Sequence, residues 1–310
     1  MRVLFFGTPA FALPSLEALL DAGFDVPVVV TQPDRPVGRS GKPRPSAVGE
    51  FAASRGLSVE KPEKVRGNRQ LLEHLRKTRP DAIAVVAYGR ILPGEILELP
   101  PLGCVNVHAS LLPRHRGASP IASSILAGDR ETGVVTMKIV PELDAGPLYL
   151  ERRVAIAAND DAASLSDRLG REGAQLLVET LRGLESGTLE PRPQEGEPTF
   201  SRPLTREHGA VDWNLPAAEI ERRFRAYRPW PGLHARLGAE RVKLLEIQRA
   251  NGIVSAREPG SIWEERARTL VAAGGGTAIV LERVQRAGRK PVAGSEFLRG
   301  LGGRSVRFDT

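Results

Sequence analysis

The chain has 310 residues, of which 41% are hydrophobic and 26% charged, with a formal net charge of +7; these values are typical of a soluble globular protein, and the length favours two domains. Its single cysteine, Cys104, excludes an internal disulfide and a cysteine-rich metal site. No apolar run approaches the ~18 residues of a membrane span, and the apolar start is too short for a signal peptide, so we expect a cytoplasmic protein without membrane contact.

The first half of the chain alternates strand and helix patterns. Uniformly apolar or β-rich runs predict buried strands at residues 3–6, 26–31, 83–87, 104–108 and 133–139. Helical spacing of apolar side chains predicts helices at residues 11–20, 71–75 and 121–126. This alternation indicates an α/β fold with a doubly wound, mostly parallel sheet, which binds ligands at the carboxyl ends of its strands.

The second half changes character after a long amphipathic helix at residues 161–186. Residues 187–203 are rich in proline and lack periodicity, which is typical of a linker. A helix at 217–227 and short β-like runs at 242–247, 260–263, 269–272, 278–284 and 305–308 then predict a small β-barrel. We expect an α/β domain over 1–188, a linker over 189–205 and the barrel over 206–310.

Positive charge gathers in the last third of the chain. Residues 206–310 carry 19 Lys and Arg against 12 Asp and Glu, whereas residues 1–205 carry 25 of each. A basic region beside a neutral one indicates a polyanionic partner, with nucleic acid the first candidate. An arginine-rich proteome explains the charge equally well.

A second basic segment lies at residues 31–46, TQPDRPVGRSGKPRPS. Arg35, Arg39, Lys42 and Arg44 stand there against one acid, Asp34. Its glycines and prolines predict a loop without helix or strand. From composition alone, a solvated flexible loop is the favoured interpretation.

Three polar residues follow predicted strands and suggest a catalytic site. Asn106 and His108 share one face of the strand at 104–108, because side chains alternate along a strand. Asp144 follows the strand that ends near Val140, so we expect it at a neighbouring carboxyl end. An amide can donate to an oxyanion, an imidazole can move a proton and a carboxylate can orient the imidazole. Without a serine or cysteine nucleophile in the group, the pattern favours transfer between two substrates.

The stretch NVHASLLPRHRGASPI at residues 106–121, followed by LDAGPL at 143–148, resembles the folate-dependent formyltransferase family. The hallmark of that family is Asn-x-His, then SLLP, then a distant Asp. The resemblance continues in FGTPAFA at 6–12, TQPDRPVGR at 31–39, VVAYGRILP at 85–93, DWN at 212–214 and RAYRPWPG at 225–232. It therefore covers nearly the whole chain.

The resemblance implies a Rossmann-like formyltransferase domain followed by an OB-like barrel that helps to hold tRNA. It implies 10-formyltetrahydrofolate as formyl donor and the α-amino group of methionine on initiator tRNA as acceptor. The five histidines are scattered along the chain, so we expect no metal, and we expect a monomer. The catalytic trio would be Asn106, His108 and Asp144. The folate-contacting residues would be Ser110, Leu111, Leu112 and Pro113. The loop at 31–46 would reach the tRNA acceptor stem through Arg35, Arg39, Lys42 and Arg44, which replaces the interpretation from composition.

The chain departs from the family pattern at three positions. His115 stands where Trp or Tyr is usual, Ala122 where Gln is frequent, and Pro147 ends LDAGP where LDTGD is commoner. Two other functions remain open: a sugar-nucleotide or glycinamide-nucleotide formyltransferase, which shares the trio, and a non-catalytic RNA-binding protein on the same scaffold. The basic segments and RGASP favour tRNA as substrate, and the intact trio favours an enzyme.

Overall fold

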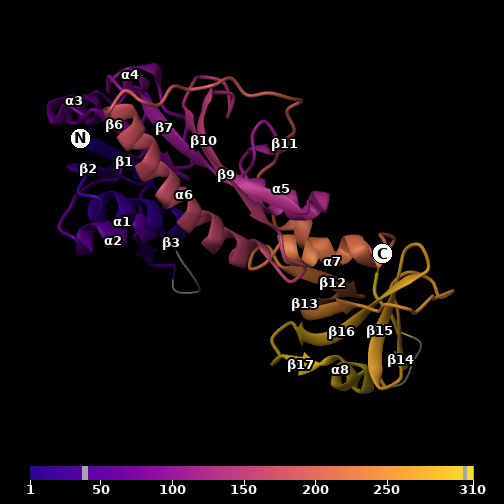
Figure 1. Cartoon of the computed structure of the whole chain (residues 1–310). Coiled ribbons are helices and arrows are strands. Elements are labelled where there is room, and N and C mark those ends of the chain that lie inside the picture. Colours follow the sequence, from indigo (N-terminus) through magenta and orange to yellow (C-terminus); the bar gives the residue numbers. More distant parts are fainter. Residues whose placement is uncertain (37–40, 303–305, 310) are drawn as a thin grey trace. The chain divides into compact units, whose positions relative to one another are not determined.

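The computed structural model describes residues 1–36, 41–302 and 306–309 and divides the chain into two compact units (Figure 1). The first unit comprises Met1–Ile121, Arg130–Ile156 and Leu165–Arg202. The second comprises Ala122–Asp129, Ala157–Ser164 and Pro203–Thr310. The sequence predicts different limits, with domains at 1–188 and 206–310 and a linker at 189–205. These domain limits stay a prediction.

The first unit is built on a seven-stranded sheet. Its strands are, in spatial order, β10 (Leu148–Ala155), β9 (Glu131–Lys138), β7 (Cys104–His108), β6 (Ala82–Val86), β1 (Val3–Gly7), β2 (Val28–Val30) and β5 (Ser58–Glu60). The five strands from β7 to β5 are parallel to their neighbours, whereas β9 and β10 pair antiparallel. The predicted mostly parallel sheet is therefore confirmed.

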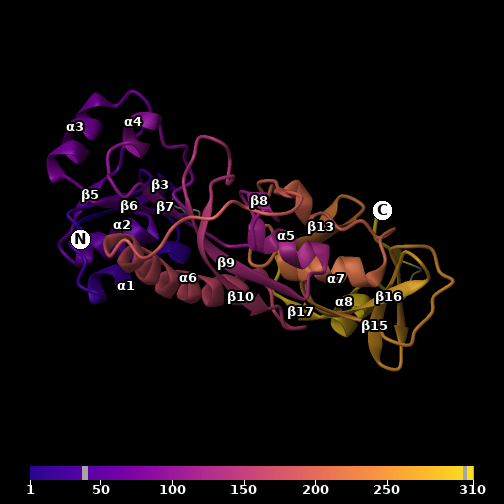
Figure 2. The ribbon, with the colours of Figure 1, turned by 45° about the horizontal axis from the view of Figure 1, so that its top comes forward.

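Helices cover both faces of this sheet, as a doubly wound fold requires. Figure 2 shows α3 (Arg69–Thr78) and α4 (Gly94–Leu97) on one face and α1 (Leu13–Asp21) and α6 (Ala162–Glu185) on the other. Helix α6 approaches the sheet closely through Gly173, where an added Cβ would lie 2.7 Å from a methyl group of Val107. Helix α2 (Ala47–Ser54) begins at Ser46, whose hydroxyl accepts from the Gly49 N–H.

Local chemistry also sets the start of α3. The Asn68 side chain accepts a hydrogen bond of 3.0 Å from the Leu71 N–H and thereby satisfies one of the free donors of the first turn. Leu71, Leu72 and Leu75 are buried against β-strand side chains of the same core. Within the described residues, no helix is both long enough and apolar enough to cross a membrane.

The second unit is a curled antiparallel sheet. Its strands are, in spatial order, β12 (Leu233–Leu237), β13 (Glu240–Arg249), β16 (Thr277–Arg286), β15 (Arg268–Ala273), β14 (Ser261–Glu265) and β18 (Val306–Arg307), with β17 (Val292–Ala293) beside β16. The Asp309 N–H, just after β18, donates to the Arg236 carbonyl of β12 at 2.9 Å, so the two edges of the sheet meet there. This half-barrel confirms the predicted small barrel.

An aromatic stack fills the core of the second unit. Trp213 and Phe308 are fully buried, and their rings stack at 5.4 Å between centroids. Phe297, from α8 (Gly294–Gly300), stacks on Phe308 as well, with 6.1 Å between the ring centroids. Helix α7 (Ala217–Ala226) packs against β13.

The loop at residues 31–46 holds more regular structure than its composition predicts. Strands β3 (Arg35–Pro36) and β4 (Pro43–Arg44) pair antiparallel, so the interpretation that glycine and proline exclude strands here was wrong. The pairing is possible because each strand has two residues, and Pro36 lies opposite Pro43, where neither can donate to the ladder.

Candidate active site

Asn106 and His108 lie on β7, as predicted. Val107 between them faces helix α6, so the two polar side chains face the other side of the sheet. Asn106 is half-buried and His108 is buried. The Asn106 amide makes no hydrogen bond to another described residue. It is therefore a donor and acceptor available to a bound molecule.

Two contacts fix the His108 imidazole. Its Nε2 lies 3.2 Å from the His115 carbonyl oxygen, and its Nδ1 lies 3.7 Å from Asp144 Oδ2. A carbonyl can only accept, so we assign the proton of the neutral ring to Nε2. Nδ1 is then the basic nitrogen, with a carboxylate beside it.

Burial lowers the pKa of His108 below its ordinary value of 6.5. The Asp144 carboxylate and the hydrogen bond to the His115 carbonyl act in the opposite direction and raise the pKa, but they do not outweigh burial. The His115 ring lowers it further. His108 is therefore neutral near pH 7 and able to accept a proton.

Asp144 reaches His108 by a route that differs from the predicted one. Strand β9 runs antiparallel to β7, so its carboxyl end lies beside Cys104, at the opposite end of β7 from His108. The expectation of neighbouring carboxyl ends was therefore wrong, and the loop after β9 brings the carboxylate back to the imidazole. Asp144 adopts a left-handed φ of 47°, and its Oδ2 accepts from the Gly117 N–H at 2.8 Å.

Gly146 allows this loop to lie close to β9. An added Cβ would overlap the Lys138 carbonyl oxygen, so only glycine fits without displacing the chain. The departure at Pro147 leaves this contact intact, because its carbonyl accepts from the Lys138 N–H at 2.9 Å.

His115, which also departs from the family pattern, contributes to the site through its backbone. It has a left-handed φ of 59°, and its N–H donates to Thr199 Oγ1 at 2.8 Å while its carbonyl faces His108. Because these groups belong to the main chain, other residue types can supply them too.

The SLLP segment, residues 110–113, begins two residues after His108. The Ser110 hydroxyl donates to the Arg114 carbonyl at 2.6 Å. Leu112 is buried in a small cluster with Val135, Met137 and Leu148. These contacts hold the segment against β9 and β10.

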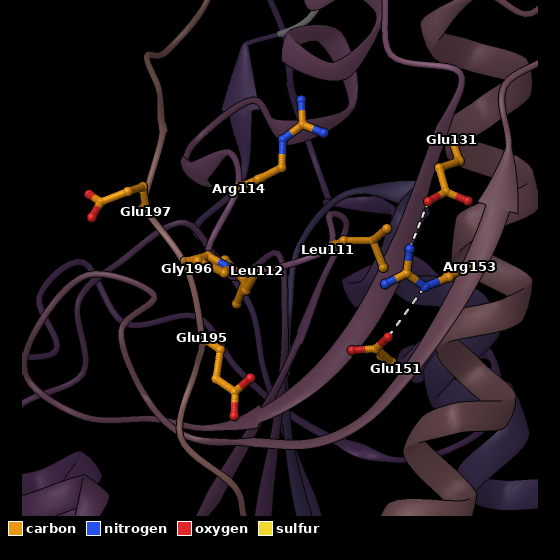
Figure 3. Close-up of a pocket in the computed structure, with 10 residues that line it drawn as sticks. Leu111, Leu112, Arg114, Glu131, Glu151, Arg153, Glu195, Gly196 and Glu197 are labelled. Atoms are coloured by element: carbon orange, nitrogen blue, oxygen red, sulfur yellow. Dashed lines mark hydrogen bonds and ion pairs between the residues drawn. The ribbon is translucent and has the colours of Figure 1, made fainter.

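One face of this segment lines a cavity of about 340 Å³ (Figure 3). Its walls also carry four carboxylates and two guanidinium groups, from Glu131, Glu151, Glu195, Glu197, Arg114 and Arg153. Arg153 lies between Glu131 and Glu151, at 2.7 and 3.5 Å. The excess of carboxylates disfavours an anionic ligand, and Asn106, His108 and Asp144 do not line this cavity.

Two side chains near the site, Cys104 and Ser110, are of types that can act as nucleophiles, but neither is available for covalent catalysis. Cys104 is buried, and burial raises the pKa of its thiol to about 12, so no thiolate forms near pH 7. The Ser110 hydroxyl donates to a backbone carbonyl instead of a base. The described residues hold no group of three or more His, Cys, Asp or Glu that could bind a metal ion.

The predicted tRNA-contacting residues stand in the basic loop. Arg35, Lys42 and Arg44 are exposed there, on or beside strands β3 and β4. Arg39 lies outside the described residues. Asp34, the only acid in the sequence of this loop, pairs with Lys61, which lies outside the loop, at 2.6 Å.

Sequence analysis missed several residues that support the site. Gln194 and Gly117 both contact the residues around Asp144, and Thr199 holds His115. RGASP gave a partial signal for Gly117. Gln194 and Thr199 lie in a proline-rich segment without periodicity, so no local pattern marked them.

Two family models match the chain. The model described as formyl transferase matches residues 1–181, and the one described as formyl transferase, C-terminal domain, matches residues 203–302. The first model covers more than half of the chain and contains the whole trio. Fold and site thus define a formyl transferase.

Similar proteins of known name show to which group of formyl transferases the chain belongs. Over 300 residues the chain is 43% identical to the methionyl-tRNA formyltransferase of Chromobacterium violaceum, covering 97% of this chain and 96% of the relative. It is 44% identical over 301 residues to the enzyme of the same name from Koribacter versatilis, with 97% and 96% coverage. The chain belongs to the methionyl-tRNA formyltransferase family.

Solved structures share the fold. The N-formyltransferase of Helicobacter canadensis, in complex with folinic acid and dTDP-3-aminofucose, gives a TM-score of 0.65 at 19% identity and covers 91% of this chain and 98% of its own. The methionyl-tRNA formyltransferase of Clostridium thermocellum gives 0.56 at 16% identity, with 81% and 95% coverage. At these identities the likeness concerns the fold.

Proposed function

We propose that the chain transfers a formyl group from 10-formyltetrahydrofolate to the α-amino group of methionine on initiator tRNA, for translation initiation. The observation that carries this proposal is the free Asn106 amide beside a neutral His108 whose basic nitrogen faces Asp144. Similarity to methionyl-tRNA formyltransferases over 97% of the chain supports the choice of acceptor.

The three side chains divide the reaction between them. The α-amine attacks the formyl carbon and a C–N bond forms, while negative charge develops on the formyl oxygen. The Asn106 amide donates to that oxygen. His108 accepts the amine proton on Nδ1, and the carboxylate of Asp144 stabilises the imidazolium at 3.7 Å. The bond from the formyl carbon to folate N10 then breaks, and N10 receives the proton.

The choice of base follows from the assigned tautomer. With its Nε2 proton directed at the His115 carbonyl, His108 has no second proton to donate to the formyl oxygen. We therefore assign the base role to His108 and the oxyanion donor role to Asn106. Asp144 acts on the imidazole, held in place by the Gly117 N–H.

The binding residues are part of the same proposal. Ser110, Leu111, Leu112 and Pro113 would contact the folate outside the cavity that Leu111, Leu112 and Pro113 line, because excess carboxylate lines that cavity and folate carries a negatively charged tail. Arg35, Lys42 and Arg44, together with Arg39, would contact the acceptor stem of the tRNA. We also propose that the protein acts as a monomer in the cytoplasm.

The deciding experiment offers the purified protein 10-formyltetrahydrofolate together with charged initiator tRNA, and in parallel with amino sugar nucleotides or glycinamide ribonucleotide. We expect formyl transfer to the tRNA alone, with binding to the same tRNA measured on filters. Transfer to a nucleotide acceptor instead would favour one of the other formyltransferases. Binding of tRNA without transfer to any acceptor would favour a non-catalytic RNA-binding protein.

A further inference from the structure

A proline-rich segment far along the chain supports the catalytic residues of the first unit. Residues 192–201, called the strap here, begin where Arg192 exchanges two backbone hydrogen bonds with Leu148 at 2.7 and 2.8 Å. They end where β11 (Phe200–Ser201) pairs parallel with β8 (Arg116–Gly117). The strap therefore joins the start of β10 to the segment that follows SLLP.

Gln194 is the residue of the strap whose side chain contacts the Asp144 loop. Its Nε2 donates to the carbonyls of Asp144 and Gly146, both at 2.8 Å. Its Oε1 accepts from Arg116 Nη2 at 2.6 Å and from Nε at 3.1 Å. One side chain thus uses every polar atom to connect the Asp144 loop with the residue next to Gly117.

The same two segments are also joined directly at the carboxylate, because the Gly117 N–H donates to Asp144 Oδ2. Asp144 itself has a left-handed φ, which costs free energy for a residue other than glycine unless the surroundings fix it. Gln194 supplies such fixing through the Asp144 carbonyl. Without it, the loop loses its only side-chain donors to these two carbonyls among the described residues.

The strap reaches the other contact of His108 as well. Thr199 Oγ1 accepts from the His115 N–H at 2.8 Å, and the Thr199 carbonyl accepts from the Arg116 N–H at 2.8 Å. The His115 carbonyl is the group that faces His108 Nε2. Both contacts of the imidazole therefore depend on groups that the strap holds.

We infer that Gln194 is a positioning residue for formyl transfer, which holds the Asp144 carboxylate beside His108 by clamping the Asp144 loop to Arg116. The expected effect of Gln194 on kcat rests on the proposed function. Its role in placing Asp144 beside His108 rests on geometry alone. Misplacement of a catalytic group by ~1 Å can cost ~100-fold in rate, so loss of the clamp should lower kcat by about ten- to a hundredfold. KM values should change little, because Gln194 contacts neither binding segment.

The test compares Gln194→Met, which keeps the length of the side chain and removes its hydrogen bonds, with Gln175→Met as matched control. Gln175 lies on α6 and accepts from Arg152 at 2.9 Å, away from the site. Besides kcat and KM, the pKa of His108 is measured by NMR titration of labelled imidazoles, with the signal assigned through a His108→Gln variant. The charged and titratable groups acting on His108 are Asp144 and the His115 ring.

We expect Gln194→Met to lower both kcat and the pKa of His108, because the carboxylate that raises this pKa moves away, while Gln175→Met changes neither. Should Gln194→Met not fold, Gln194→Glu serves instead: it can still accept from Arg116 but cannot donate to the two carbonyls, and its kcat should fall similarly. A native kcat and His108 pKa in a folded variant would overturn the inference, as would a kcat loss without a pKa change. If the native protein transfers no formyl group, the proposed function fails while the NMR titration still decides whether Gln194 positions Asp144.

Discussion

Replacing Asn106 by Ala separates catalysis from stability, because the Asn106 amide bonds to no other described residue. Folding therefore gains no hydrogen bond between this amide and the described part of the chain, and the variant should keep a melting temperature close to that of the native protein. In the reaction the amide is the proposed oxyanion donor. Removing one such donor typically costs about 2.7–4 kcal/mol of barrier, or roughly 10²–10³ in kcat.

Asn68→Ala is the matched control, since it changes the same residue type within the same unit. Asn68 accepts from the Leu71 N–H at 3.0 Å as the N-cap of α3. Its loss should cost ~1 kcal/mol of unfolding free energy and leave kcat unchanged. Formylation kinetics and urea unfolding of both variants test the pair of expectations. A kcat of Asn106→Ala within about threefold of native, where ~10² is expected, would refute the oxyanion role.

Three further outcomes are expected. Burial lowers the pKa of His108 and His234 below 6.5, so the unfolded chain binds more protons than the folded chain at low pH. The unfolding free energy should therefore fall as pH drops below about 6.5, and less steeply in His108→Gln. Calorimetry that gives the same pH dependence for the native protein and the variant would contradict this. In Gly146→Ala the added methyl would overlap the Lys138 carbonyl, so unfolding free energy should fall by about 1–3 kcal/mol together with kcat, and a native melting temperature would be contrary to this packing. Arg44→Ala should weaken initiator tRNA binding and flatten its salt dependence by about 0.7–0.9 per lost phosphate contact; an unchanged slope in filter binding would remove Arg44 from the interface.

The buried strands were the easiest part of the fold to predict. Strand β7 was predicted because Cys104, Val105 and Val107 give it an apolar pattern. Its two polar residues, Asn106 and His108, stand out against that pattern. Strand β10 was missed, since Glu151, Arg152 and Arg153 interrupt its apolar pattern and only one of its faces is covered at the edge of the sheet. A strand buried on both faces leaves a continuous apolar signal, and an edge strand does not.

Within the site, sequence reasoning identified which side chains belong together but not how they meet. The pairing of Asn106 with His108 follows from the two-residue period of a strand. The approach of Asp144 depends on the antiparallel direction of β9 and on the return of the following loop. Gln194 contacts carbonyls about 50 residues earlier in the chain, and no local pattern encodes such a contact.

The aromatic stack of the second unit has a consequence for how the protein is made. Trp213 is buried against Phe308, whose position in the chain is 95 residues later. At roughly 5–20 residues per second, a ribosome adds those residues in about 5 to 19 s. Throughout that interval the indole of Trp213 has no stacking partner, so the nascent half-barrel exposes its core. We expect this stage of synthesis, after the first unit has emerged, to be the one at which aggregation competes with folding and a chaperone has most effect.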